Sequence, residues 1–119
     1  MIAQNGASQA AIRVRSVPGK GFALGLAGKA ANEAELILIG VSSREDVSIG
    51  RGENRGRTIE YTNVVLEEAA IARWNGGPMS LPVLESDLAR VSGDGRADRF
   101  AAVLREPGGG RVLAASWLR

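Results

Sequence analysis

Short runs of alternating apolar and polar residues, separated by glycine-rich turns, dominate this 119-residue chain. The clearest run is Thr58–Val65, and a similar alternation occurs at Ile12–Arg15 and at Phe22–Leu26. Alternation with a period of two is typical of strands that have one buried face. With 16 glycines marking the turns, the pattern predicts an all-β fold, an antiparallel β-sandwich of seven or eight short strands.

The expected strands follow from these runs and from the turns between them. In Glu35–Val41, apolar residues occupy both faces, which indicates a central strand. Pro82 indicates that the segment around it is a strand at a sheet edge or an irregular piece. A turn is expected at Ser42–Asp46, and a helical turn at Asp87–Arg90. The predicted strands cover residues 10–17, 22–27, 35–41, 47–49, 58–65, 79–84, 100–104 and 112–118. The segment 66–74 fits a helix by its Ala and Glu content and a strand by its apolar spacing.

The length suits one domain, expected at residues 10–119 after a flexible lead-in of residues 1–9. There is no Cys and no His, which excludes disulfides, thiol redox chemistry, zinc–thiolate sites and His-based catalysis. We therefore expect no cofactor and no metal. The net charge is only +2 and there is a single tyrosine, so nucleic-acid binding is not expected. The N-terminus lacks the pattern of an export signal, and no apolar run is long enough to span a membrane.

A charged, glycine-rich loop between two apolar runs is the first candidate binding site. Arg51, Arg55 and Arg57 could hold a carboxylate or phosphate through forked guanidinium contacts, with Glu53 and Asn54 orienting them. The favoured interpretation is simpler: an exposed hairpin loop whose charges pair with each other. The glycine spacing of Gly50, Gly52 and Gly56 does not match a phosphate-binding loop.

The aromatic residues give a second set of candidates. Trp74, beside Asn75-Gly76-Gly77, could stack on a sugar, although a core position is favoured for it and equally for Trp117. Tyr61 is expected to pack its ring inward. Carboxylate pairs such as Glu85 with Asp87 could support a hydrolase, but solvated turns explain them better. The chain is therefore expected to be non-catalytic.

Several stretches of the sequence resemble a known family. These stretches are similar to the C-terminal half of DUF1223 proteins, which are predicted secreted bacterial proteins of unknown function: residues 49–58, Tyr61–Val65, Arg73–Gly77, Asp98–Ala101 and Glu106–Leu113. The resemblance covers about Ala10 to Leu118. In the family the segment after Asn-Val-Val reads as a long strand, which favours a strand at 66–74. Here that segment begins Leu-Glu-Glu where the family usually has Arg.

The resemblance implies a partner. Family proteins are about twice as long, and their N-terminal half is thioredoxin-like with a Cys-x-x-Cys that has no counterpart here. It therefore implies an accessory or interaction domain for a thioredoxin-like domain or protein, with an apolar patch left bare where that half would dock. It also implies a secreted or periplasmic location. The alternative is a stand-alone binding domain for an anionic or carbohydrate ligand, using the 51–57 loop and Trp74.

Overall fold

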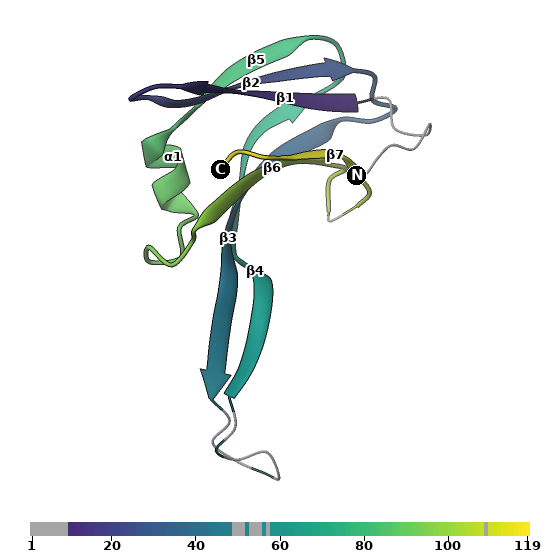
Figure 1. The fold of residues 1–119 in the computed structure, drawn as a ribbon. Coiled ribbons are helices and arrows are strands. Elements are labelled where there is room, and N and C mark those ends of the chain that lie inside the picture. The colour runs from purple at the N-terminus through teal and green to yellow at the C-terminus, as the bar shows by residue number, and fades with distance from the viewer. Residues whose placement is uncertain (1–9, 49–51, 53–55, 57, 109) are drawn as a thin grey trace.

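A computed structural model describes residues 10–48, 52, 56, 58–108 and 110–119 of the chain. Within these residues there are seven strands and one short helix (Figure 1). In chain order they are β1 (Ala10–Val17), β2 (Gly21–Gly28), β3 (Ala34–Ser48), β4 (Thr58–Trp74), β5 (Met79–Leu84), α1 (Glu85–Arg90), β6 (Arg99–Arg105) and β7 (Val112–Trp117).

The strands form two antiparallel sheets. The first has three strands in the order β1-β2-β5, and the second has four in the order β4-β3-β6-β7. In Figure 1 the three-stranded sheet lies across the upper part of the four-stranded one, and α1 lies at one end. Strand β3 pairs with both β4 and β6, and β5 lies at a sheet edge, as the sequence predicts. The all-β antiparallel architecture is confirmed.

The core lies between the inner faces of the two sheets. The alternating apolar residues of β2 point inward, so that Leu24 is 1% exposed and Leu26 is 2% exposed. The same alternation buries Leu36 and Leu38 of β3. Burial of side chains of this size provides most of the driving force for folding. The core also includes Phe22, Ala34, Trp74, Val83, Leu88, Val91, Phe100, Ala102, Leu104 and Leu118.

Helix α1 carries the chain from the three-stranded sheet towards the four-stranded sheet. Its start is fixed by the Asp87 carboxylate, which accepts a hydrogen bond of 2.8 Å from the backbone N–H of Leu84. Glu85 and Asp87 also place negative charge in the first turn, where the helix dipole favours it. The helix buries Leu88 and delivers Val91 to the core. The expected helical turn at Asp87–Arg90 is therefore part of a slightly longer helix.

The predicted turn at Ser42–Asp46 is wrong, as is the separate strand at 47–49. Strand β3 runs unbroken from Ala34 to Ser48, and its outer part pairs with β4 from Ser42 opposite Val64 to Ser48 opposite Thr58. We call this two-stranded extension, residues 42–48 and 58–64, the arm; it projects away from the sandwich in Figure 1. Solvent reaches both faces of such a ribbon, so its polar composition resembles that of a turn. Residue 49 lies outside the described residues.

The ambiguous segment 66–74 is a strand, the inner half of β4. Its pairing with β3 extends to Ala34 opposite Trp74, with register shifts between Leu36 and Ile37 and between Gly40 and Val41. Helix propensity of the Ala and Glu residues is weak, and pairing with a central strand overrides it. Strands β3 and β4, with 15 and 17 residues, are also much longer than the short strands expected.

Candidate functional site

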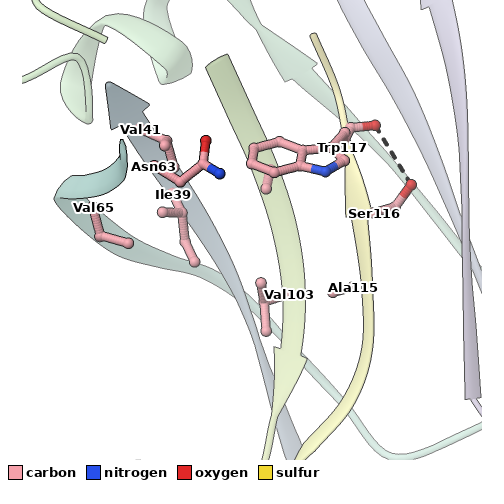
Figure 2. A pocket seen from close by; sticks show the side chains of 9 residues that line it. Ile39, Val41, Asn63, Val65, Val103, Ala115, Ser116 and Trp117 are labelled. Carbon is pink, nitrogen blue, oxygen red and sulfur yellow. Dashed lines mark hydrogen bonds between the residues drawn. The ribbon is translucent and has the colours of Figure 1, made fainter. Parts of the chain in front are cut away.

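The outer face of the four-stranded sheet carries an apolar pocket of about 460 Å³ (Figure 2). It faces away from the core between the sheets. Its lining comes from all four strands of that sheet: Ile39, Val41, Asn63, Val65, Ala101, Val103, Ala115, Ser116 and Trp117. A shallow concave surface of this composition is suited to holding an apolar side chain of another molecule.

Strand register explains why apolar residues gather here. Leu36 and Leu38 of β3 point into the core, so Ile37, Ile39 and Val41 point outward. Ile39 lies opposite Ala101 of β6, which lies opposite Trp117 of β7. One residue pair further along, Ile37, Val103 and Ala115 form a second row. Ile37 is only 2% exposed and does not line the pocket, so its floor is formed by the other apolar residues of these two rows.

Two large apolar residues at the pocket edge are exposed to solvent. The exposed fraction is 54% for Val65 and 47% for Trp117. The guanidinium of Arg99 lies 3.6 Å from the centre of the Trp117 ring, in a cation–π contact that supports the indole on the surface. The core position favoured for Trp117 is therefore wrong. Tyr61, which was expected to pack inward, is 48% exposed on the arm.

Asn63 stands where the arm leaves the sandwich, and it lines the same pocket. Its φ angle is 50°, a left-handed conformation that a non-glycine residue seldom adopts and that asparagine tolerates best. The β3–β4 register contains pairs on both sides of this point, Ser42 with Val64 and Arg44 with Thr62. The unusual backbone conformation of Asn63 is a kink in β4 between the part in the sandwich and the part in the arm. It places the Asn63 side-chain amide beside the apolar floor of the pocket.

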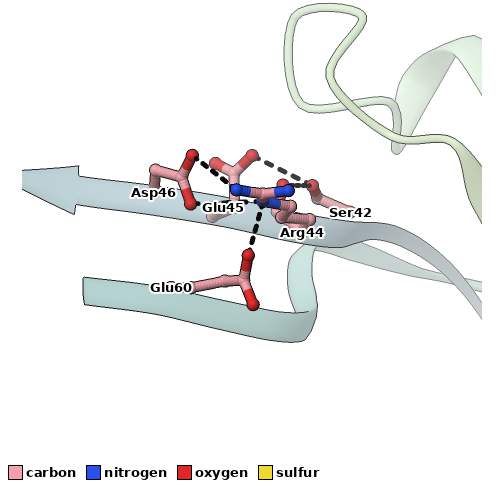
Figure 3. Close-up of polar contacts among 5 residues, drawn as sticks. All are labelled: Ser42, Arg44, Glu45, Asp46 and Glu60. Atoms are coloured by element: carbon pink, nitrogen blue, oxygen red, sulfur yellow. Dashed lines mark hydrogen bonds and ion pairs between the residues drawn. The ribbon is translucent and has the colours of Figure 1, made fainter. Parts of the chain in front are cut away.

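Ion pairs fix the arm beyond this kink (Figure 3). Arg44 of β3 lies 2.7 Å from the Glu60 carboxylate on β4 and 3.3 Å from that of Asp46. The hydrogen bond and charge of Asp46, followed by the charge of Glu60, raise the pKa of Arg44 above its ordinary value. Arg96 pairs with Glu45, which also accepts a hydrogen bond of 2.9 Å from Ser42. The ion pairs of Arg44 are exposed, so each contributes little stability but helps to set the direction of the arm.

Asp98 anchors the base of the arm to the start of β6. Its carboxylate accepts a 2.8 Å hydrogen bond from the Ser43 N–H and a second bond from the Ser43 hydroxyl. These two bonds lower the pKa of Asp98 below 3.8. A lowered pKa in the folded state means that the ionised carboxylate stabilises the fold above pH 3.8, and that this contribution is lost as the pH falls through the folded-state value.

We therefore expect Asp98→Asn to cause a small decrease in Tm at neutral pH, because the amide cannot accept both bonds. The difference from the unchanged protein should be constant above about pH 5 and should disappear as Asp98 itself is protonated. Thermal melts between pH 2 and pH 7 measure this. The matched variant Asp94→Asn, in the nearby turn, changes a carboxylate that is not bonded to Ser43 and should not lower the Tm at neutral pH. A D98N penalty that does not shrink between pH 5 and pH 2 would contradict this role of the carboxylate.

The residues predicted from the charged loop, Arg51, Glu53, Asn54, Arg55 and Arg57, lie outside the described residues. Trp74 is described, and it lies in the core with 2% exposure. Its indole N–H donates a 2.8 Å hydrogen bond to the Gly77 carbonyl, which ties the end of β4 to the following turn. A ring in this position cannot stack on a sugar without unfolding of its surroundings. Trp74 therefore occupies the core position that was favoured from the sequence.

The candidate carboxylate pair Glu85 with Asp87, and Asp98 of the further sequence candidate Asp94 with Asp98, have structural contacts. Asp87 caps α1, and Glu85 forms an ion pair of 3.2 Å with Arg119. Asp98 holds Ser43, as described above. No group of three potential metal-ligating side chains occurs among the residues that the structure describes. Within the same residues, no helix is both long and apolar enough to cross a membrane.

Sequence reasoning anticipated an apolar patch on this domain but did not identify its residues. Two signals were available: apolar residues on both faces of Glu35–Val41, and alternation in the last two strands that gives Ala101, Val103 and Trp117 a common face. The contribution of Asn63 and Val65 could not be found in this way, because it depends on the kink that separates the arm from the sandwich.

Comparisons with known proteins place the chain in a family and confirm its fold. Among solved structures, the chain is similar to the crystal structure of a protein from Agrobacterium tumefaciens that a structural genomics consortium determined. The TM-score is 0.66 and the sequence identity is 15%. The match covers 92% of this chain and 46% of that protein, so the chain spans about half the length of its structural neighbour. No curated protein matches in sequence. The model of the family described as protein of unknown function (DUF1223) matches residues 2–103, so the chain belongs to the DUF1223 family.

Proposed function

We propose that this chain is a non-catalytic accessory module that docks a thioredoxin-like domain or protein on the outer face of its four-stranded sheet. The observation that carries the proposal is the apolar pocket on that face, with Val65 and Trp117 about half exposed at its edge. An exposed apolar surface of this kind is typical of an interaction site. An exposed tryptophan with an arginine against its ring is a composition typical of residues that dominate binding energy.

The choice of partner rests on the family. The resemblance described above implies a thioredoxin-like half in longer members, and this chain spans 46% of its structural neighbour. A domain that had such a neighbour would retain an apolar surface where the two met. Contact between domains of one chain commonly buries about 600–1,500 Å². The alternative, a stand-alone binding domain using the 51–57 loop, has no support from Trp74, which lies in the core.

Replacing Val65 by glutamate tests this proposal with a matched control. Val65 and Val112 are exposed to nearly the same extent, 54% and 55%, but only Val65 lines the pocket. We expect V65E to weaken binding of the N-terminal thioredoxin-like half of a longer family protein by about thirtyfold, a loss of about 2 kcal/mol, because a charged side chain would replace an apolar one in the contact. V112E should bind as the unchanged protein does. Isothermal titration calorimetry measures both.

Thermal melts of the two variants are the control for folding, and both should stay close to the unchanged protein because each site is exposed. Equal weakening by V65E and V112E would contradict docking at the pocket. Undiminished binding by V65E would do the same. Self-association of the chain that V65E abolishes, in the absence of any binding to the thioredoxin-like half, would mean that a second copy covers this face.

A further inference from the structure

The outer face of the three-stranded sheet carries positive charge and no negative charge. Arg13 and Arg15 of β1 point outward, while Ile12 and Val14 between and beside them pack against the core. Strand pairing places small or uncharged residues next to the two arginines. Among the residues that the structure describes, the strand positions on this face are Ala11, Arg13, Arg15, Val17, Gly21, Ala23, Gly25, Ala27, Ser80, Pro82 and Leu84, with no Asp or Glu among them.

The two arginines also differ from most of the other arginines that the structure describes. Six of those form ion pairs with nearby acids: Arg44, Arg73, Arg96, Arg105, Arg111 and Arg119. In the described part of the chain, neither Arg13 nor Arg15 forms an ion pair. Their charge is therefore not neutralised locally, and their guanidinium donors remain available to an anion from solution.

A hollow of about 480 Å³ lies beside these arginines. Gly25 forms its floor at the centre of the middle strand, with Arg13 opposite it on one side and Ser80 opposite it on the other. Neither backbone conformation nor packing requires glycine here. A Cβ atom at this position would have as its nearest neighbour only the Cβ of Arg13, at 4.0 Å, and its φ angle is not positive.

A glycine inside a strand weakens it, and such a glycine often marks a place where a ligand approaches the backbone closely. The missing side chain leaves the space between Arg13 and Ser80 open. Arg15 lies two residues along the same strand face, about 7 Å from Arg13. The long, flexible side chains of Arg13 and Arg15 can therefore both reach over Gly25. The Ser80 hydroxyl is a further hydrogen-bond donor on the opposite side.

We propose that this surface binds the phosphate group of a phosphorylated small molecule. A phosphate monoester carries a charge of about −1.5 to −2 at neutral pH, which matches the two arginines, and its three oxygens can accept forked guanidinium bonds together with a hydroxyl bond. The face is on the opposite side of the sandwich from the apolar pocket. The phosphate site and the docking of a partner are therefore independent of each other.

Titration of the 119-residue chain with glycerol phosphate tests the site, followed by calorimetry and by backbone amide NMR shifts. Shifts should concentrate on β1, β2 and β5. The double variant R13A/R15A, which removes the guanidinium groups, should weaken binding at least tenfold. Gly25→Val, which fills the floor and leaves both arginines, should do the same. Arg90→Ala, which removes an exposed arginine from α1, should bind as the unchanged protein does.

The same titration is repeated with inorganic phosphate and with vesicles containing phosphatidic acid. Binding of inorganic phosphate with the same dependence on Arg13 and Arg15 would support the proposal. Binding to vesicles without binding of glycerol phosphate would overturn it in favour of a membrane surface. Unchanged affinity in R13A/R15A or in G25V, or NMR shifts confined to other strands, would also overturn it. Thermal melts confirm that both variants are folded.

Discussion

Replacing Gly40 by alanine is expected to destabilise the protein by about 3 kcal/mol or more, because the added methyl group has no space. A Cβ atom at Gly40 would lie 1.7 Å from the Val91 carbonyl oxygen and 2.8 Å from its carbon. These are backbone atoms, and they cannot turn aside as the end of a flexible side chain can. Relief would require the segment after α1 to move, and that segment begins with the buried residue Val91.

Gly25→Ala provides the control, since it makes the same chemical change in a strand with open space around it. Removing the conformational freedom of glycine from the unfolded chain should raise stability there by about 0.4–1 kcal/mol. Urea unfolding of both variants measures the difference. A G40A variant within 1 kcal/mol of the unchanged protein would mean that β3 and the Val91 segment do not approach as closely as described.

Replacing Trp74 by alanine is expected to cost about 3–5 kcal/mol, the usual range for a large aromatic residue removed from a core. Trp74 is 2% exposed and belongs to the same buried cluster as Leu24 and Leu36. Trp74→Phe separates the two contributions of the side chain. It retains most of the apolar volume but leaves the Gly77 carbonyl without the indole N–H, at a cost of about 1–3 kcal/mol if that oxygen stays buried.

Urea unfolding of W74A and W74F measures both effects. The outcome also separates the two interpretations of Trp74 made from the sequence. A ring that served as a sugar platform would be exposed, and W74A would then leave stability within about 0.5 kcal/mol of the unchanged protein. That result would contradict the core position.

The fold could be predicted where a local pattern matched a local structure. The alternation of Phe22, Leu24 and Leu26 buried those side chains as expected, and the glycine-rich segments at 18–21 and 107–110 connect paired strands. The arm could not be predicted, because its polar stretch Ser42–Asp46 has the composition of a turn. Its strand conformation depends on backbone pairing with β4, from Ser42 opposite Val64 to Ser48 opposite Thr58.

The candidate site was predictable only in outline. A charged loop attracts attention in a sequence, whereas an apolar surface has the same composition as a core. Ile39, Val103 and Trp117 are the types of residue expected inside, and only the layer arrangement shows that no second sheet covers them. The family resemblance indicated that such a surface should exist. Its location required the strand order β4-β3-β6-β7.

The two tryptophan indole N–H groups allow a direct test of docking at the apolar pocket. A ¹⁵N-labelled sample of the chain has two such signals, and they report on opposite environments: the Trp74 N–H is bonded to the Gly77 carbonyl in the core, and Trp117 lies exposed at the pocket edge. Addition of the thioredoxin-like half of a longer family protein should shift the Trp117 indole signal and slow its exchange with water. The Trp74 signal should not change. A complex that forms while the Trp117 signal stays unchanged would contradict the proposal that the outer face of the four-stranded sheet is the docking surface.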